Sequence, residues 1–489
     1  MQKKRDSRER RAGGITSPAA GAAAGRTLSV MAAVAAFVAA FGFFLVAYPY
    51  HLMRREQLTL FLFDGDYIRQ TYRGAGWLAA FAADFLEQFF RLPVVGPLVV
   101  ALLLTAIGAV VYRICRHFMG RWPSLAVAAV FYLWSFMRET DNTFITRYTI
   151  VVLGYLSLLL LALQARRAWL RAAAAALLLA AGAWALGSPF HKYYGRPWGV
   201  PRLDYERMVA LDTEVARENW DKVLKLSEKD LYMVEASYCY DLAHAMKGDL
   251  GDALFNHSQS GPYDLLLRVS TDRAAFSNCL AGEAWYQLGD MTVAEQSAVI
   301  ALQGSPKHTG SRFIARLAMV NLLSGEDAAA QKYLDMLGKT LFYGQSARRM
   351  MPGNRDDATE ARLTAARNTL IQRDFIHQSD NPKAVLQALL EADSSNTLAL
   401  NYLLCFDLMR FDLEGFMEDY DQDMARGHIY DEAVLIWLGQ RDALYEDNAA
   451  MYGISPSLVN KMDWFLRNPD GYKDTYWYYY LNALKESER

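Results

Sequence analysis

Asp64 and Asp66 are the side chains with the clearest potential for chemistry in this sequence. They flank Gly65, and four arginines lie near them along the chain. A carboxylate can act as a general base or help to hold a metal ion, and arginines can hold a phosphate group. An Asp-Gly-Asp turn is also typical of a solvated surface turn with no chemical role. The sequence leaves both interpretations open. The four arginines are Arg54, Arg55, Arg69 and Arg73.

Other sequence motifs give no sign of a catalytic or metal site. Gly338-Lys339-Thr340 resembles the end of a phosphate-binding loop, but Tyr333 stands where that loop requires its first glycine. The eight histidines are scattered, without the paired spacing of metal ligands on one helix face. The cysteines form no Cys-x-x-Cys pair, and we expect small core side chains rather than a Cys239–Cys279 disulfide or a zinc site. We therefore expect no cofactor and no bound metal.

Composition divides the chain into two halves. Lys and Arg number 51 against 53 Asp and Glu in 489 residues, so the chain has no overall bias towards nucleic acid. Apolar residues make up 53%, and every long apolar run falls before Leu186. This distribution predicts a membrane half followed by a soluble half.

The membrane half is predicted to begin with a basic cytoplasmic tail, residues 1–26, and to continue as a transmembrane domain, residues 27–187. The first apolar run is too long for a signal-peptide core, so we expect a retained anchor. The expected spans, about five in number, are Leu28–Ala47, Pro93–Tyr112, Trp122–Met137, Tyr148–Leu163 and Ala172–Gly187.

Arginines in the short loops predict the orientation of this domain. One group follows the second expected span and another follows the fourth, so both loops belong with the basic tail in the cytoplasm. Five spans then place the C-terminal half on the outer side. If the short third span is re-entrant, the C-terminal half moves to the cytoplasm. The arginines are Arg113, Arg116, Arg121, Arg166, Arg167 and Arg171.

The first outer loop, residues 48–92, is long and contains an amphipathic element. Trp77, Phe81, Phe85 and Phe89 recur every four residues, which predicts a helix along the membrane surface or capping the bundle. Polyprenyl-phosphate-sugar-dependent glycosyltransferases resemble this arrangement in one respect, an acidic residue in the first outer loop beside an in-plane helix. The resemblance implies a catalytic role for Asp64 and Asp66, although the expected spans are too few for that class.

Residues 188–202 contain three prolines among aromatic residues and are predicted to form a stiff linker. From residue 203 to 489 the apolar pattern is helical, without a run of alternating strand residues. Three glycines are each followed five residues later by an alanine, and the glycines are 41 and 36 residues apart. This spacing resembles tetratricopeptide (TPR) repeats, which implies stacked helical hairpins with a concave groove for a peptide or protein. The three pairs are Gly248 and Ala253, Gly289 and Ala294, and Gly325 and Ala330.

Two stretches of the soluble half depart from this repeat. Residues 344–358 contain Pro352 and Gly353 and are predicted to form a loop or a break in the stack. Near the C-terminus, residues 476–480 are five consecutive aromatic residues. They form either a helix that caps the last repeat or an aromatic ligand patch. We favour the cap, because five adjacent rings cannot all face one groove.

The order of these features resembles an uncharacterised family of bacterial multi-pass envelope membrane proteins. The resemblance includes the basic tail, the motifs around Glu56 and Asp66, the surface helix, the spans, the TPR-like half and the aromatic end. It implies only an all-α architecture, a transmembrane helix bundle followed by a soluble TPR-like α-solenoid. That architecture implies the bacterial inner membrane as the location, with the N-terminus cytoplasmic and the C-terminal domain periplasmic.

The preferred functional prediction is an integral membrane protein that displays the solenoid to bind or scaffold a protein or peptide in the cell envelope. Its expected partners are the lipid bilayer and a protein, not nucleic acid. The alternative is a polyprenyl-phosphate-sugar-dependent glycosyltransferase or related envelope enzyme, in which Asp64 and Asp66 lie near the reaction. The sequence favours the binding protein over the enzyme but does not decide between them.

Overall fold

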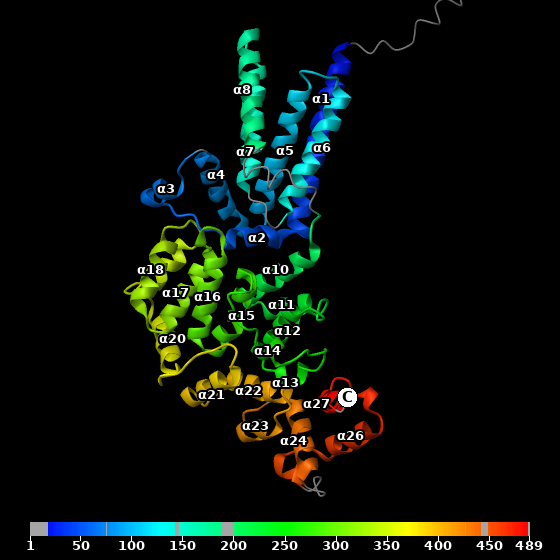
Figure 1. The fold of residues 1–489 in the computed structure, drawn as a ribbon, viewed down its shortest axis with the longest axis vertical. Helices are drawn as coiled ribbons and strands as arrows, with labels where there is room; N and C mark the ends of the chain where they lie inside the picture. The colour runs from blue at the N-terminus through cyan, green and yellow to red at the C-terminus, as the bar shows by residue number, and fades with distance from the viewer. Residues whose placement is uncertain are drawn as a thin grey trace, which may run out of the picture. The chain divides into compact units, whose positions relative to one another are not determined.

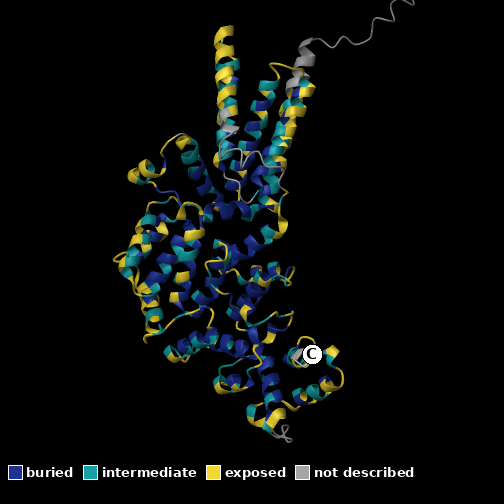
Figure 2. Cartoon of the chain, viewed as in Figure 1, coloured by how far each residue is buried: buried dark blue, intermediate teal, exposed yellow. Residues whose placement is uncertain are grey.

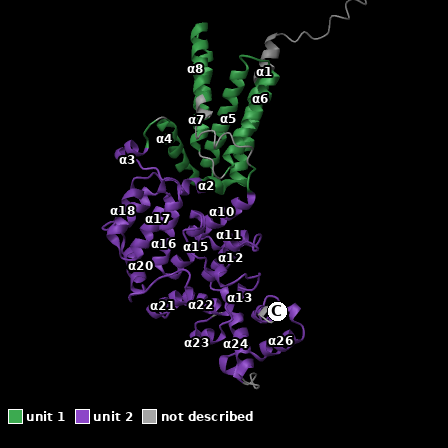
Figure 3. Cartoon of the chain, viewed as in Figure 1, with its two compact units in different colours: residues 1–53, 72–202 green, residues 54–71, 203–489 purple. Residues whose placement is uncertain are grey.

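The structure is a computed structural model that describes residues 18–74, 76–141, 146–186, 200–425, 427–441 and 448–487. Within those ranges every regular element is a helix and no strand occurs, so the all-α prediction is confirmed. The basic tail falls largely outside the described residues, as does most of the proline-rich linker. The chain forms two compact units, which Figure 3 shows in different colours. Unit 1 comprises residues 1–53 and 72–202, and unit 2 comprises residues 54–71 and 203–489.

Unit 1 is built around helix α5, which packs against α1, α6 and α7. Its buried apolar residues form two clusters along α5, one centred on Phe44 and Leu104 and one on Ile107 and Val152. The helices of unit 1 are α1 (Pro18–Gly42), η2 (Phe43–Ala47), α2 (Pro49–Gln57, whose last four residues belong to unit 2), α4 (Trp77–Glu87), η3 (Gln88–Arg91), α5 (Val95–Cys115), α6 (Arg121–Glu139), α7 (Thr146–Leu163) and α8 (Ala168–Leu186).

Three stretches of unit 1 are long and apolar enough to cross a membrane, which indicates that the protein is membrane-associated. They are Thr27–Ala47, Val95–Cys115 and Thr146–Leu163. Helix α6 carries charged residues at both ends and does not reach this standard. The apolar part of α8, Ala168–Ala183, is shorter. Figure 2 shows α8 exposed along most of its length, as expected for a helix whose apolar side chains have no protein around them. The number of crossings predicted from sequence stays a prediction.

Helix α4 was predicted as an amphipathic surface helix, and its polar side lies inward. Asp84 and Glu87 are buried, whereas Trp77 and Leu78 at its start are exposed. The Asp84 carboxylate accepts a hydrogen bond from the Tyr72 hydroxyl at 2.8 Å. Phe81, Phe85 and Phe89 of the aromatic stripe are half-buried, and contact of this face with lipid stays a prediction.

Unit 2 is a succession of short helices in which neighbours along the chain pack against each other, most extensively from α15 to α18 (Figure 1). Its helices are α3 (Gly65–Thr71), α10 (Leu203–Ala216), α11 (Trp220–Ser227), α12 (Val234–Lys247), α13 (Leu250–Ala253), α14 (Pro262–Leu265), α15 (Ala275–Leu288), α16 (Met291–Gly304), η4 (Pro306–His308), α17 (Ser311–Leu323), α18 (Asp327–Gly338), α19 (Gly344–Met350), α20 (Asp357–Asn368), α21 (Pro382–Ala392), α22 (Thr397–Met409), α23 (Leu413–Asp419), α24 (His428–Arg441), η5 (Ala450–Tyr452), α26 (Pro456–Arg467), η6 (Pro469–Gly471) and α27 (Tyr476–Ser487).

The three predicted glycine–alanine pairs lie at turns between consecutive helices. Gly248, Gly289 and Gly325 follow α12, α15 and α17 with φ between +81° and +98°, a conformation in which glycine avoids the strain of a Cβ atom. The alanine of each pair is buried at 3% exposure or less in α13, α16 or α18. Helix α13 has only four residues, so the first pair begins no full second helix. The assignment of these hairpins to the TPR class stays a prediction.

Of the two stretches that depart from the repeat, residues 344–358 are partly helical and residues 476–480 wholly so. Residues 344–350, predicted as part of a loop or break, form helix α19, while residues 351–356 are irregular. In the aromatic end, Tyr476 and Trp477 are buried at the start of α27. The Trp477 indole N–H donates to the carbonyl oxygen of Glu432 in α24 at 2.9 Å, which fits the predicted capping role.

Candidate functional site

Asp64, the first of the two predicted catalytic residues, caps the start of helix α3. Its Oδ1 accepts hydrogen bonds from the backbone N–H groups of Asp66, at 3.1 Å, and Tyr67, at 2.9 Å. Its Oδ2 accepts a third from Lys339 Nζ at 2.8 Å. The Lys339 ammonium, followed by the Tyr67 N–H, holds the pKa of Asp64 below its ordinary value. A carboxylate stabilised in this way is a weaker general base than a free one.

Asp66, the second, is exposed in the first turn of α3, where a negative charge suits the helix dipole. The structure places one of the four predicted arginines, Arg54, at a different group. Arg54 is buried against Asp212, at 3.8 Å, and lies over the ring of Phe276. The structure therefore brings Asp64 together with Lys339, a residue that the sequence pattern did not connect to it. Within the described residues, no group of three or more His, Cys, Asp or Glu side chains is arranged to hold a metal ion.

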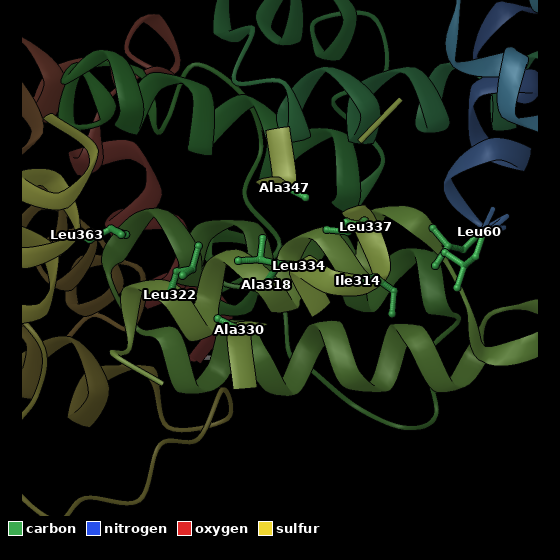
Figure 4. Packing of buried hydrophobic residues seen from close by; sticks show 10 residues of the cluster. Leu60, Ile314, Ala318, Leu322, Ala330, Leu334, Leu337, Ala347 and Leu363 are labelled. Atoms are coloured by element: carbon green, nitrogen blue, oxygen red, sulfur yellow. The ribbon is translucent and has the colours of Figure 1, made fainter. Parts of the chain in front are cut away.

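Residues 58–64, hereafter the 58–64 segment, connect α2 to α3 and lie against the middle of unit 2. The backbone carbonyl of Thr59 accepts a hydrogen bond from Ser311 N–H at 3.2 Å, and Phe63 N–H donates to the carbonyl of Lys339 at 2.8 Å. Leu60 and Leu62 are buried in a cluster with apolar residues of α17, α18, α19 and α20. Figure 4 shows Leu60 at one end of this cluster, near Ile314, and Leu363 at the other. Part of the predicted outer loop is thus core of the helical unit.

Just before this segment, Glu56 is buried and holds the start of α17. Its Oε1 accepts hydrogen bonds from the Tyr343 hydroxyl, at 2.9 Å, and the Ser311 hydroxyl, at 3.1 Å. Gly310 permits this close approach, because a Cβ atom there would lie 3.0 Å from the carbonyl oxygen of Gln57. The Glu56 region of the sequence pattern therefore has a structural role in unit 2.

A buried ionic cluster lies between α10, α15 and α17, next to Arg54. Arg312 pairs with Asp212 through Nη1 and with Glu283 through Nη2, the latter at 3.1 Å. Arg316 Nη2 lies 2.5 Å from the other Glu283 oxygen. Asp212 and Glu283 are each at most 1% exposed. Three arginines are thus held together by two acidic residues from different helices, Asp212 in α10 and Glu283 in α15.

The electrostatics of this cluster favour the charged forms. Burial acts to raise the pKa of Glu283, but Arg316 and Arg312 outweigh it, so that pKa lies below its ordinary value. Burial acts to lower the pKa of Arg312, but Asp212 together with Glu283 outweighs it, so that pKa lies above its ordinary value. Arg316 also stacks on the ring of Tyr286, its Cζ 3.7 Å from the ring centre. The cluster joins three helices and exposes little charge.

A second buried polar group joins α12 to the loop that follows α13. Asp241 is fully buried, and its carboxylate lies 3.0 Å from His257 Nε2 and accepts from Gln259 Nε2 at 3.0 Å. Burial raises the pKa of Asp241. Burial also acts to lower the pKa of His257, but the contact with Asp241 outweighs it and the pKa is raised. These side-chain contacts hold the irregular loop against α12.

A third buried polar group lies in unit 1, where α2, α6 and α7 meet. Glu139 is fully buried and accepts a hydrogen bond from the Thr149 hydroxyl, while its backbone carbonyl oxygen lies 2.9 Å from His51 Nε2. Arg138 is 1% exposed and lies 3.9 Å from Asp141. Ionisable side chains inside a membrane-associated helix bundle are costly and therefore informative. The charges at the end of α6 serve these contacts, which explains why that helix is less apolar than its neighbours.

One open cavity, of about 490 Å³, lies near the start of α24. Its lining includes Asp252, His428 and Asp431, with the rings of Tyr420 and Tyr452. His428 Nδ1 lies 2.9 Å from Asp252, and burial raises the pKa of Asp431. The lining is polar and acidic, and it contains none of the residues predicted from sequence.

Sequence reasoning missed the buried ionic cluster for a physical reason. Asp212, Glu283 and Arg312 sit in amphipathic helical patterns in which a charged residue ordinarily marks the solvent side. The signal that could have revealed them is a charge at an inward helical position: Glu283 lies between Gly282 and Ala284, inside α15.

These features define a membrane-associated, all-helical protein whose helical unit is held together by buried charges. The family model for DUF6057, described as a family of unknown function, matches residues 26–195 and 190–483. The chain belongs to that family. No curated protein and no solved structure matches it.

Proposed function

We propose that the protein is a membrane-anchored scaffold that binds a protein or peptide partner through its helical unit. The observation that carries the proposal is the construction of unit 2. Consecutive helices pack in hairpins whose turns use left-handed glycines, and the buried ionic cluster pairs Glu283 with Arg312 between α15 and α17. Stacked helical hairpins of this kind present extended surfaces suited to protein binding.

The chemistry of the predicted aspartates supports the same proposal. Asp64 has three hydrogen bonds that fix α3 and join it to Lys339, and Asp66 is exposed on α3. Each arrangement is accounted for by helix capping and an ion pair. The glycosyltransferase alternative keeps one supporting observation, the proximity of an acidic turn and a lysine that could contact a phosphate.

We place the helical unit on the periplasmic side of a bacterial inner membrane. The basic tail and the arginine-rich short loops favour a cytoplasmic N-terminus. Five crossings, by α1, α5, α6, α7 and α8, keep both arginine-rich loops in the cytoplasm and put the helical unit outside it, whereas four crossings, without α6, would put the helical unit in the cytoplasm. Reporter fusions after Gly120, Arg166 and Val200 test this orientation. A cytoplasmic signal after Val200 would refute it.

We propose helix α26 as the first candidate for the partner-binding surface. Trp464 and Leu466 are 61% and 63% exposed there, while Phe465 between them is buried. An exposed tryptophan beside Arg467, whose Cζ lies 5.5 Å from the ring centre, has the composition of an interface hot spot.

The test combines crosslinking and complementation. A photocrosslinking residue at position 464 is expected to give a discrete adduct in cells, and the same residue at position 465, which is buried, provides the matched control. In a deletion strain with a phenotype, Asp64→Asn with Asp66→Asn is expected to complement, whereas Trp464→Ala is expected to fail. Normal levels of the aspartate variant without complementation would favour the enzyme.

A further inference from the structure

The 58–64 segment has the contacts of a bound peptide. It has no regular secondary structure, and backbone hydrogen bonds fix it near both ends, at Thr59 and at Phe63. Between these points two leucines enter the apolar cluster of α17 and α18, and Asp64 then meets Lys339. Backbone hydrogen bonds with pockets for particular side chains are the usual way in which a protein reads an extended peptide.

The contacts define what the surface reads. Leu60 and Leu62, two residues apart, enter the cluster that includes Ile314, Leu334 and Leu337. Phe61 lies between them and is also buried, with the ring centres of the segment's own Phe63 and of Tyr67 5.1 Å and 6.3 Å away. Tyr67 also donates a hydrogen bond to the Leu60 carbonyl at 2.9 Å, which turns α3 back over the segment.

The charged end of the segment is held differently from its apolar part. The Asp64–Lys339 pair is solvent-accessible, with the lysine side chain 51% exposed and the aspartate 27%. An exposed pair adds little affinity but fixes direction and register. The recognised pattern is therefore Leu-x-Leu-x-Asp, in which the leucines give affinity and the aspartate gives polarity.

We infer that the face formed by α17, α18 and α19 is a peptide-binding site for an extended Leu-x-Leu-x-Asp segment, which the chain's own residues 58–64 occupy in the resting state. An external segment of this chemistry binds only when residues 58–64 leave the site. This inference deepens the proposed scaffold function and rests on it in one respect, that the helical unit binds extended segments.

The experiment measures whether a free peptide with the sequence of residues 54–71 binds the full-length protein in detergent. A fluorescent label on the peptide reports binding through anisotropy. Wild type, with its site occupied, is expected to bind weakly. The variant Leu60→Ala with Leu62→Ala is expected to bind at least tenfold more tightly, because its own segment has lost both anchors. Ile376→Ala is the control, since that apolar side chain is 76% exposed and lies outside both the segment and the apolar cluster, and it is expected to behave as wild type.

Specificity is tested with a second peptide in which both leucines are replaced by aspartate, which is expected not to bind any variant. Equal binding of the first peptide to wild type and to the double variant would overturn the inference. So would no binding to a double variant that retains its helical circular dichroism.

If the double variant does not fold, Asp64→Asn takes its place. That substitution weakens the chain's own contact with Lys339, which stays available to the aspartate of the free peptide, and leaves the apolar cluster intact, so a gain in peptide affinity of roughly two- to fivefold over wild type is expected. No gain would overturn the inference. Failure here leaves crosslinking at position 464 unaffected, so the scaffold proposal and this inference fail independently.

Discussion

Glu283→Gln perturbs the buried ionic cluster with the smallest change in shape. Glutamine has almost the same volume as glutamate but no charge, and its amide nitrogen is a donor. In the wild type the two carboxylate oxygens each face an arginine, Arg312 at 3.1 Å and Arg316 at 2.5 Å. The variant can accept from one guanidinium through its remaining oxygen, while its NH₂ group faces the donors of the other.

The expected cost follows from burial. Glu283 is 1% exposed, so water cannot replace the lost charge. Removing one partner of a buried ion pair typically costs about 3–5 kcal/mol. Because every 1.4 kcal/mol is a factor of ten, the local opening equilibrium is expected to rise by roughly a hundredfold to several thousandfold.

Hydrogen–deuterium exchange of the full-length protein in detergent measures this effect where it occurs. Amides of α15 and α17 are expected to lose protection, because Glu283 joins these two helices. The matched control is Glu391→Gln, which breaks a pair of the same chemistry, Arg373–Glu391 at 3.1 Å, on a surface where both side chains are more than half exposed. That control is expected to cost about 0.5 kcal/mol or less.

A double-mutant cycle with Arg316→Gln separates the ion pair from other effects of the substitution. If Glu283 and Arg316 stabilise each other, the double variant costs less than the sum of the two single variants. Unchanged exchange in α15 and α17, or exactly additive costs, would refute the account of the cluster as a mutually dependent set of charges.

Three further predictions concern pH, helix packing and a buried hydroxyl. Burial raises the pKa of Glu432 to about 7, so the folded state holds this proton more tightly than the unfolded chain does. The free energy of unfolding is therefore expected to fall by roughly 3 kcal/mol as pH rises from about 4.5 to 7. Chemical denaturation at a series of pH values measures this fall, which Glu432→Gln should lack. Gly282→Ala would place a Cβ atom 1.8 Å from Ser297 Oγ, so thermal unfolding is expected to show a stability loss of about 1–3 kcal/mol. Adding Ser297→Gly should recover most of that stability. No recovery would show that packing is not the cause. Tyr238→Phe removes a buried hydroxyl that donates to the Leu280 carbonyl at 2.9 Å and accepts from Ala284 N–H at 3.0 Å. The same thermal assay should show a stability loss of about 1–3 kcal/mol. An unchanged unfolding midpoint would show that α15 compensates for the two lost hydrogen bonds.

The sequence contained enough information to predict the helices and several of their ends. Gly289 and Asp290 illustrate why: a glycine that can adopt positive φ ends α15, and the aspartate that follows accepts from Val293 N–H at 2.9 Å to start α16. These are interactions between near neighbours in the chain, and residue types alone reveal them. The apolar runs of α1, α5 and α7 were visible for the same reason.

The contacts that hold the helices together were not predictable in the same way. Glu56 meets Ser311 and Tyr343 across more than 250 residues, and nothing in the local pattern of either partner indicates the other. Gly282 shows the same limitation, because its need for space comes from Ser297 on the next helix. The predicted chemistry of Asp64 rested on arginines close in sequence, whereas its actual partner, Lys339, lies 275 residues away.

The position of residues 54–71 changes what the helical unit is. Read along the chain, the soluble half begins at residue 203, after the last apolar run. In three dimensions the same unit takes Arg54 and Glu56 from the end of α2, and two leucines from the 58–64 segment that follows it. A buried arginine paired with Asp212, and a buried glutamate that holds the start of α17, are costly to leave without partners. The helical unit is therefore completed by a segment that follows α1 and α2 in the chain, and we expect an insertion within the 58–64 segment to destabilise unit 2 as directly as a substitution within α17.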